Sequence, residues 1–285
     1  MAGILSGKKS LGLDKLEGLE IYEEEENKGL KIKKKAEPKE VAVLEEKDFL
    51  LDKTFSCPVC DKQFSSKVMK TGKAKLIGTD IDLRYRYEGI DSIKYDLVTC
   101  PRCGYAALIR YFTTTIAAQA KLIKASIYGK VKLQEMKGET YSYEDMLERY
   151  KLALACAIVK KAKDSEKAYI CLKTAWLLRG YAEELELKNE LTEPLRQELK
   201  EQELEYIQNA LEGFVSAVQK ESTPICGMDT LTIDYLIAAL AYQVKKDDIA
   251  AKKLAEILVS NAANERVKNR ARELKQLVLD RHRKG

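Results

Sequence analysis

The sequence predicts an α+β fold class, in which a small β module precedes an all-α domain of helical hairpins. Apolar and polar residues alternate from Ile81 to Glu88, and this period of two is typical of a half-buried strand. From Tyr111 onward the apolar residues recur at spacings of three and four, which is typical of amphipathic helices. Two Cys-Pro-x-Cys motifs, at 57–60 and 100–103, flank the predicted strand. Together these observations divide the chain into a β part and a helical part.

Residues 1–47 are predicted to form a charged, partly disordered N-terminal arm. Acidic residues run from Glu23 to Glu26 and basic residues from Lys33 to Lys35, and charge blocks of this kind rarely form a packed core. A leucine-rich stretch at residues 11–21 fits a short helix that either folds back on its own domain or binds the groove of a partner. Folding back is the simpler of the two alternatives.

Residues 48–112 are predicted to form a zinc-ribbon-like metal module. Each Cys-Pro-x-Cys motif places two thiolates three positions apart, and two such pairs complete a tetrahedral site. We expect this site to hold one structural Zn²⁺, although iron suits the same ligands. Ordinary buried thiols, two disulfides or a redox-active thiol pair are further alternatives. The predicted metal ligands are Cys57, Cys60, Cys100 and Cys103.

The closed metal site and the few other candidate catalytic residues argue against most enzymatic chemistry. A site with four protein ligands keeps no position for water or substrate. The single histidine, His282, lies three residues from the end of the chain, where a catalytic arrangement is not expected. Cys156 and Cys171 occupy apolar helical positions, as packed thiols do, and Cys226 follows a proline in a loop, where reactivity would need a lowered pKa. The sequence therefore favours a protein that is not an enzyme.

Basic residues accumulate around the predicted strand. Residues 61–132 contain 14 Lys and Arg against 6 Asp and Glu. Tyrosines alternate with arginines along the strand, and in such a pattern rings can stack on bases while cations contact phosphates. The alternative is a small antiparallel sheet with a solvated, charged outer face. The residues expected to contact phosphate or nucleic acid are Lys73, Lys75, Arg84, Tyr85 and Arg86.

Residues 113–285 are predicted to form a TPR-like domain of helical hairpins. Ser142 is placed to cap a helix that begins beside it, and Pro194 is placed to open another. Helix pairs of about 34 residues with Tyr and Ala at packing points are typical of tetratricopeptide repeats. Plain antiparallel helices are the alternative, because the full repeat consensus is absent.

Four stretches of the chain carry a likeness to known proteins. They are Gly12–Leu16, Phe55–Cys60, Thr71–Arg84 and Cys100–Ala107. In these stretches the chain resembles an uncharacterised bacterial family that is described only as a domain of unknown function. The likeness extends over nearly the whole chain, and the cysteine motifs are its most specific part. It implies a bacterial cytoplasmic protein with a zinc ribbon and repeat-like helices, and it implies no activity.

These features lead to three functional hypotheses. The first is a non-enzymatic adaptor or scaffold, because stacked helix pairs leave an extended surface for a protein partner. The second is a nucleic-acid-binding zinc ribbon, and the third is a thiolate redox protein or a rubredoxin-like iron protein. No apolar run approaches the length of a membrane span, and the N-terminus lacks the apolar region of a signal peptide. We therefore expect a cytoplasmic protein without membrane contact.

Overall fold

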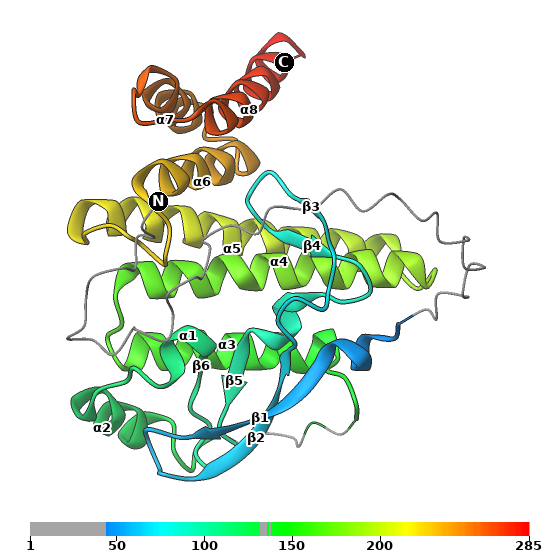
Figure 1. Ribbon diagram of the computed structural model, residues 1–285, viewed down its shortest axis with the longest axis vertical. Helices are drawn as coiled ribbons and strands as arrows, with labels where there is room; N and C mark the ends of the chain where they lie inside the picture. Colours follow the sequence, from blue (N-terminus) through cyan, green and yellow to red (C-terminus); the bar gives the residue numbers. More distant parts are fainter. Residues whose placement is uncertain (1–43, 132–135, 137, 285) are drawn as a thin grey trace, which may run out of the picture. The chain divides into compact units, whose positions relative to one another are not determined.

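The computed structural model describes residues 44–131, 136 and 138–284. Its elements follow the predicted order, with the strands first and the long helices second (Figure 1). The predicted arm, residues 1–47, lies outside the described residues as far as residue 43. Residues 46 and 47, the last two of the predicted arm, begin a short 3-10 turn, Glu46–Phe49, which buries Phe49.

Three antiparallel strand pairs make up the β part of the described residues. The strands are β1 (Leu50–Ser56), β2 (Gln63–Met69), β3 (Leu76–Thr79), β4 (Tyr85–Tyr87), β5 (Leu97–Thr99) and β6 (Ala106–Leu108). β1 pairs with β2, and Phe55 lies opposite Phe64 in the hairpin that the sequence predicts there. β3 pairs with β4, and β5 pairs with β6. The cysteine motifs occupy the turns of the first and third pairs.

The alternating segment from Ile81 to Glu88 is not the half-buried strand that its pattern predicts. Only β4 is a strand, and the residues before it form a turn in which the Asp80 N–H donates to the Arg84 carbonyl at 2.8 Å. Asp82 and Arg84 are 0% and 4% exposed, whereas Tyr85 is 55% exposed. The polar residues therefore point inward, because oppositely charged partners on the helices compensate their burial.

Eight helices follow in the described part of the chain. They are α1 (Ile109–Phe112), α2 (Ala117–Ser126), α3 (Tyr143–Val159), α4 (Asp164–Leu187), α5 (Glu193–Lys220), α6 (Thr230–Gln243), α7 (Asp247–Val259) and α8 (Glu265–Lys284). Ser142 caps α3 by accepting a hydrogen bond from the Asp145 N–H at 3.0 Å. Pro194 lies in the first turn of α5. Both helix starts are confirmed.

The helices form hairpins, but the TPR-like arrangement is not confirmed. Consecutive helices pack on one another from α3 to α8. α4 and α5 contain 24 and 28 residues, which is more than one repeat of about 34 residues can hold. α6 and α7, with 14 and 13 residues, are short enough for one repeat. The helical part therefore lacks a uniform repeat length.

Two hydrophobic cores extend across residue 112, where the change of sequence period predicts a domain boundary. The larger core joins Leu97 of β5 to the helices from α3 onward. The smaller core surrounds the cysteine motifs and contains Val98 of β5, Ile123 of α2 and Cys156 of α3. Leu97 and Val98 enter different cores because successive side chains of a strand point to opposite faces. The metal module and the helices therefore share their packing.

Candidate metal centre

The two cysteine motifs fold into the same turn. Between β1 and β2, the Asp61 N–H donates to the Cys57 carbonyl at 2.9 Å, and between β5 and β6 the Gly104 N–H donates to the Cys100 carbonyl at 3.0 Å. Asp61 and Gly104 both have positive φ, 60° and 76°. Glycine adopts this conformation at little cost, and Asp tolerates it better than most residues. Each motif thus needs a permissive residue directly after its second cysteine.

The turns bring all four sulfur atoms together. The Sγ atoms of Cys57 and Cys103 are 3.6 Å apart, and so are those of Cys60 and Cys100. All four lie within 4.8 Å of one another. Sulfurs at about 2.3 Å from one central ion would stand about 3.8 Å apart in a regular tetrahedron, whereas a disulfide needs about 2.0 Å. The four free thiols are therefore arranged as a group that could hold one metal ion.

Burial makes an uncompensated charge at this group costly. Cys57, Cys100 and Cys103 are buried, and Cys60 is partly exposed. Hydrogen bonds from Cys103 and Cys57 lower the pKa of the Cys100 thiol, and the bond to Cys100 raises the pKa of Cys103. One thiolate can thus be accommodated by its neighbours, but four thiolates need a cation. The ligand set fits a divalent metal for this reason.

An aromatic cluster supports the two turns. Phe112 of α1 packs edge-on against Phe55 and Phe64, with ring centroids 5.9 Å apart in both pairs. The same ring stacks on Tyr105 at 4.9 Å, and the Tyr105 hydroxyl is 2.7 Å from that of Thr115. These rings connect β1, β2 and the segment after the second motif, so packing fixes the two turns relative to each other.

Comparison with models of known protein families identifies the family of this chain. The model of the family described as uncharacterised protein conserved in bacteria, DUF2225, matches residues 50–278. The chain belongs to this family. The resemblance seen in the sequence is thereby confirmed, and the matched region of this DUF2225 chain contains both cysteine turns. No curated protein and no solved structure matches the chain.

Among the described residues, no helix is long and apolar enough to cross a bilayer.

The three cysteines outside the motifs have the properties of packed thiols. Cys156 lies in the smaller core, 3.8 Å from the Gly104 carbonyl, and Cys171 lies in the larger core. Burial raises the pKa of each to about 11. Burial also raises the pKa of Cys226, whose sulfur accepts a hydrogen bond from the Tyr111 hydroxyl at 3.3 Å. None of the three has the lowered pKa that a reactive cysteine requires.

The two arginines predicted to contact phosphate are paired with carboxylates. The Arg84 guanidinium is buried and lies 3.1 Å from Asp91 and 3.2 Å from Glu183. The expectation that Arg84 belongs to an exposed basic face is therefore wrong. Arg86 is partly exposed, and it pairs with Asp80 at 2.7 Å and also with Glu183. Both guanidinium groups thus hold the chain together.

The other three predicted contact residues are exposed. Lys73 and Lys75 lie in and after the turn between β2 and β3, and Lys75 is 3.8 Å from Glu88. Tyr85 projects from β4, with its ring centroid 6.4 Å from that of Tyr87. Because Arg84 and Arg86 are paired with carboxylates, the basic and aromatic surface expected from the sequence is reduced to two lysines and a tyrosine.

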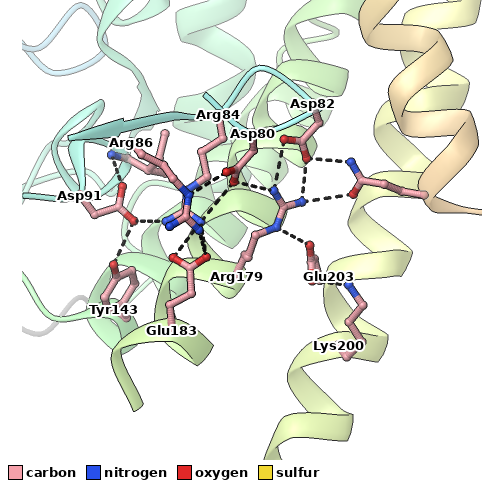
Figure 2. A network of polar contacts seen from close by, with 12 residues as sticks. Asp80, Asp82, Arg84, Arg86, Asp91, Tyr143, Arg179, Glu183, Lys200 and Glu203 are labelled. Atoms are coloured by element: carbon pink, nitrogen blue, oxygen red, sulfur yellow. Dashed lines mark hydrogen bonds and ion pairs between the residues drawn. The ribbon is translucent and has the colours of Figure 1, made fainter. Parts of the chain in front are cut away.

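A network of charged residues joins the β3–β4 hairpin to the helices (Figure 2). At its centre, Arg179 of α4 donates to Asp80 at 3.0 Å, to Asp82 at 2.7 and 3.2 Å and to Glu203 of α5 at 2.8 Å. Gln243 of α6 accepts from Arg179 at 3.2 Å and donates to Asp82 at 3.0 Å. One guanidinium thus connects the hairpin with three helices.

Sequence reasoning missed Arg179 and Glu183. The two residues lie one helical turn apart in α4, directly after the buried run that ends at Leu178. Charged residues on a helix face usually lie in solvent, so their position alone gives no signal. The alternation of Asp82 and Arg84 is the available signal, but this pattern predicts an exposed polar face.

Gly180 of α4 provides the space for the second half of this network. A Cβ atom at this position would lie 2.5 Å from Asp91 Oδ2, 2.8 Å from the Tyr143 hydroxyl and 2.9 Å from Arg84 Nη2. Those groups are bound to one another, since Tyr143 donates to Asp91 at 2.9 Å. Gly180 therefore lets α4 approach the buried ion pair closely, which explains the residue type.

Proposed function

We propose that this protein is a non-enzymatic adaptor or scaffold of the bacterial cytoplasm. In this proposal, its four cysteines bind one structural Zn²⁺, and its helical part binds a protein partner. The arrangement of the four sulfur atoms, all within 4.8 Å of one another, carries the metal-binding half. The clustering of exposed apolar side chains at one cavity supports the partner-binding half.

Zinc is the metal that this ligand set favours. Sulfur separations of 3.6 Å agree with a tetrahedral ion at about 2.3 Å from each ligand, and structural zinc sites commonly have four thiolates. Because all four positions are taken by protein ligands, the ion has a structural role, and it stabilises the shared core. Iron in the same site would produce a rubredoxin-like protein, which is the alternative.

A metal analysis of the purified protein separates these alternatives. The protein is produced in medium that contains both zinc and iron, and its bound metal and visible absorption are measured. We expect one zinc ion per chain and a colourless solution. A red protein that contains iron would contradict the structural zinc site and would indicate a rubredoxin-like electron-transfer centre.

Exposed apolar residues favour the binding of a protein partner. Ile77 of β3, Tyr85 of β4 and Leu187 of α4 are all exposed, and all three line the same cavity. Single exposed apolar residues are common on soluble proteins, whereas grouped ones mark interaction sites. A surface of this kind suits an adaptor better than an enzyme, because the cavity offers contact area and its charged lining residues are paired.

Affinity capture from the native bacterium tests the adaptor proposal. A tagged chain is crosslinked in cells and purified, and captured proteins are compared with those on a tagged unrelated protein. We expect one or a few specific partners. The absence of any specific partner contradicts the proposal.

Labelled RNA and DNA serve as the second ligand class, and we expect no binding even at low salt, where phosphate contacts are strongest.

A further inference from the structure

We propose that the cavity between the β3–β4 hairpin and the end of α4 binds a basic segment of a partner protein through an apolar anchor side chain. This inference rests on the adaptor proposal and names the surface and the chemistry of the partner. The cavity measures about 300 Å³ and its wall includes Ile77, Tyr85, Gly180 and Leu187. This volume is at the lower end of ligand pockets, which suits a side chain better than a large cofactor.

The apolar rim of the cavity is unusually exposed. Leu187 is 85% exposed at the last residue of α4, and Ile77 is 59% exposed on β3. Tyr85 adds an aromatic ring from the neighbouring strand. The three side chains come from three separate elements and line one cavity. An apolar side chain of a partner would remove all three from water, and this burial supplies the binding energy.

The cavity is held open by the charge network beside it. Arg84 and Arg86 of the hairpin both pair with Glu183 of α4, so the two walls are tied together. Gly180 keeps the α4 wall free of a Cβ atom at the point where Asp91 approaches. A preformed cavity costs little to order on binding, which favours its use as a docking site. Figure 2 shows these ion pairs between the hairpin and α4.

The charge around the cavity favours a basic partner. Four carboxylates line the cavity beside three basic residues, and Glu183 and Glu184 are among the four. The stretch from Glu183 to Glu193, at the end of α4 and the start of α5, contains five glutamates and one lysine. Glu186 and Glu190 are exposed near Leu187 in the sequence, and Glu186 pairs with Arg196 at 2.9 Å. Arg84, Arg86 and Lys94 of the wall pair with the carboxylates beside them, so the excess negative charge comes from the end of α4 and the segment that follows it. A segment that combines Lys or Arg with an apolar anchor therefore complements this surface.

A peptide-binding experiment with the full chain tests the inference. The probe is a fluorescein-labelled peptide of Lys and Leu, with the leucines at helical spacing. A second peptide carries Glu in place of each Lys, and a third carries Ser in place of each Leu. Fluorescence anisotropy is measured for the wild-type protein, for Leu187→Ser and for Val259→Ser. Val259 is the matched control, because it is 79% exposed at the end of α7 and does not line the cavity.

The expected result is binding of the Lys–Leu peptide that added salt weakens. Leu187→Ser should reduce the affinity about tenfold, since one buried leucine contact contributes that much, and Val259→Ser should leave it unchanged. The inference is overturned by equal effects of the two variants, by equal binding of the Glu–Leu peptide, or by no binding of the Lys–Leu peptide.

The same variant separates this inference from the adaptor proposal. If Leu187→Ser captures the same partner from cells as the wild-type chain, the adaptor proposal stands and this docking surface is wrong. If the wild-type chain captures no specific partner, the adaptor proposal itself is wrong.

Discussion

Arg179 and Asp82 form a bidentate ion pair, in which Nη2 and Nη1 donate to the two carboxylate oxygens at 2.7 and 3.2 Å. Asp82 belongs to the insertion between the cysteine motifs, and Arg179 belongs to α4. The pair therefore attaches the insertion to the helices at a buried position. Paired guanidinium and carboxylate groups are the strongest geometry for such a contact, so this ion pair should dominate the stability of the attachment.

Replacing Arg179 by Met should destabilise the protein by about 3–5 kcal/mol, because the Asp82 carboxylate would stay buried without its partner. Urea unfolding followed by circular dichroism measures this change. Arg196→Met is the control, since its ion pairs with Glu186 and Glu193 are exposed and should contribute less than about 1 kcal/mol. Equal losses in the two variants would contradict the account of a buried attachment.

The stability contributed by Asp82 should depend on pH in one direction. Burial raises the pKa of Asp82, but the hydrogen bonds and charge of Arg179 outweigh burial and hold the pKa below 3.8. The contribution is therefore fully present above pH 3.8 and is lost as the pH falls through the lower pKa of the folded state. Unfolding free energies of wild type and Asp82→Asn, measured against pH, should converge only in acid. A constant difference down to the lowest pH at which the chain folds would be inconsistent with this.

Gly180→Ala should destabilise the protein by about 1–3 kcal/mol, although alanine favours helices more than glycine does. The new methyl group would lie 2.5 Å from Asp91 Oδ2, and such crowding costs more than the helix preference returns. Gly78→Ala is the control, because nothing lies within 4 Å of its added Cβ. Thermal unfolding of both variants tests this prediction, and a stabilised Gly180→Ala protein would argue against the close approach of α4.

The two cysteine turns should respond oppositely to substitution at equivalent positions. Gly104→Ala places a side chain at φ 76° and should cost about 1–2 kcal/mol. Asp61→Gly relieves a positive φ of 60° and should be neutral or slightly stabilising. Urea unfolding measures both. If the costs are similar, the shared turn geometry does not govern the choice of residue.

The cysteine centre was predictable from the sequence because its signal is local. Two motifs with fixed spacing each define one turn, and thiolate chemistry requires the turns to meet around an ion. Helix starts at Ser142 and Pro194 were predictable for the same reason, since capping depends on adjacent residues. These features are confirmed by the backbone hydrogen bonds of the structure.

The charge network was not predictable, because it depends on contacts between distant segments. The alternation around Arg84 predicts a strand with a polar outer face, yet the carboxylates of Asp91 and Glu183 turn that face inward. No local pattern shows that Arg179 would reach Asp82, 97 residues away. The repeat length predicted for the helices is not observed for a similar reason. α4 and α5 are long enough to carry these contacts and to continue past them.

The zinc content of the purified chain, measured together with that of two cysteine variants, tests the central claim most directly. We predict one zinc ion per chain in the wild type and in Cys171→Ser, whose thiol lies in the larger core. We predict loss of that zinc, with a destabilised smaller core, in Cys57→Ser and Cys103→Ser. A wild-type chain without bound metal under reducing conditions, or full zinc retention in both ligand variants, would contradict the four-cysteine site.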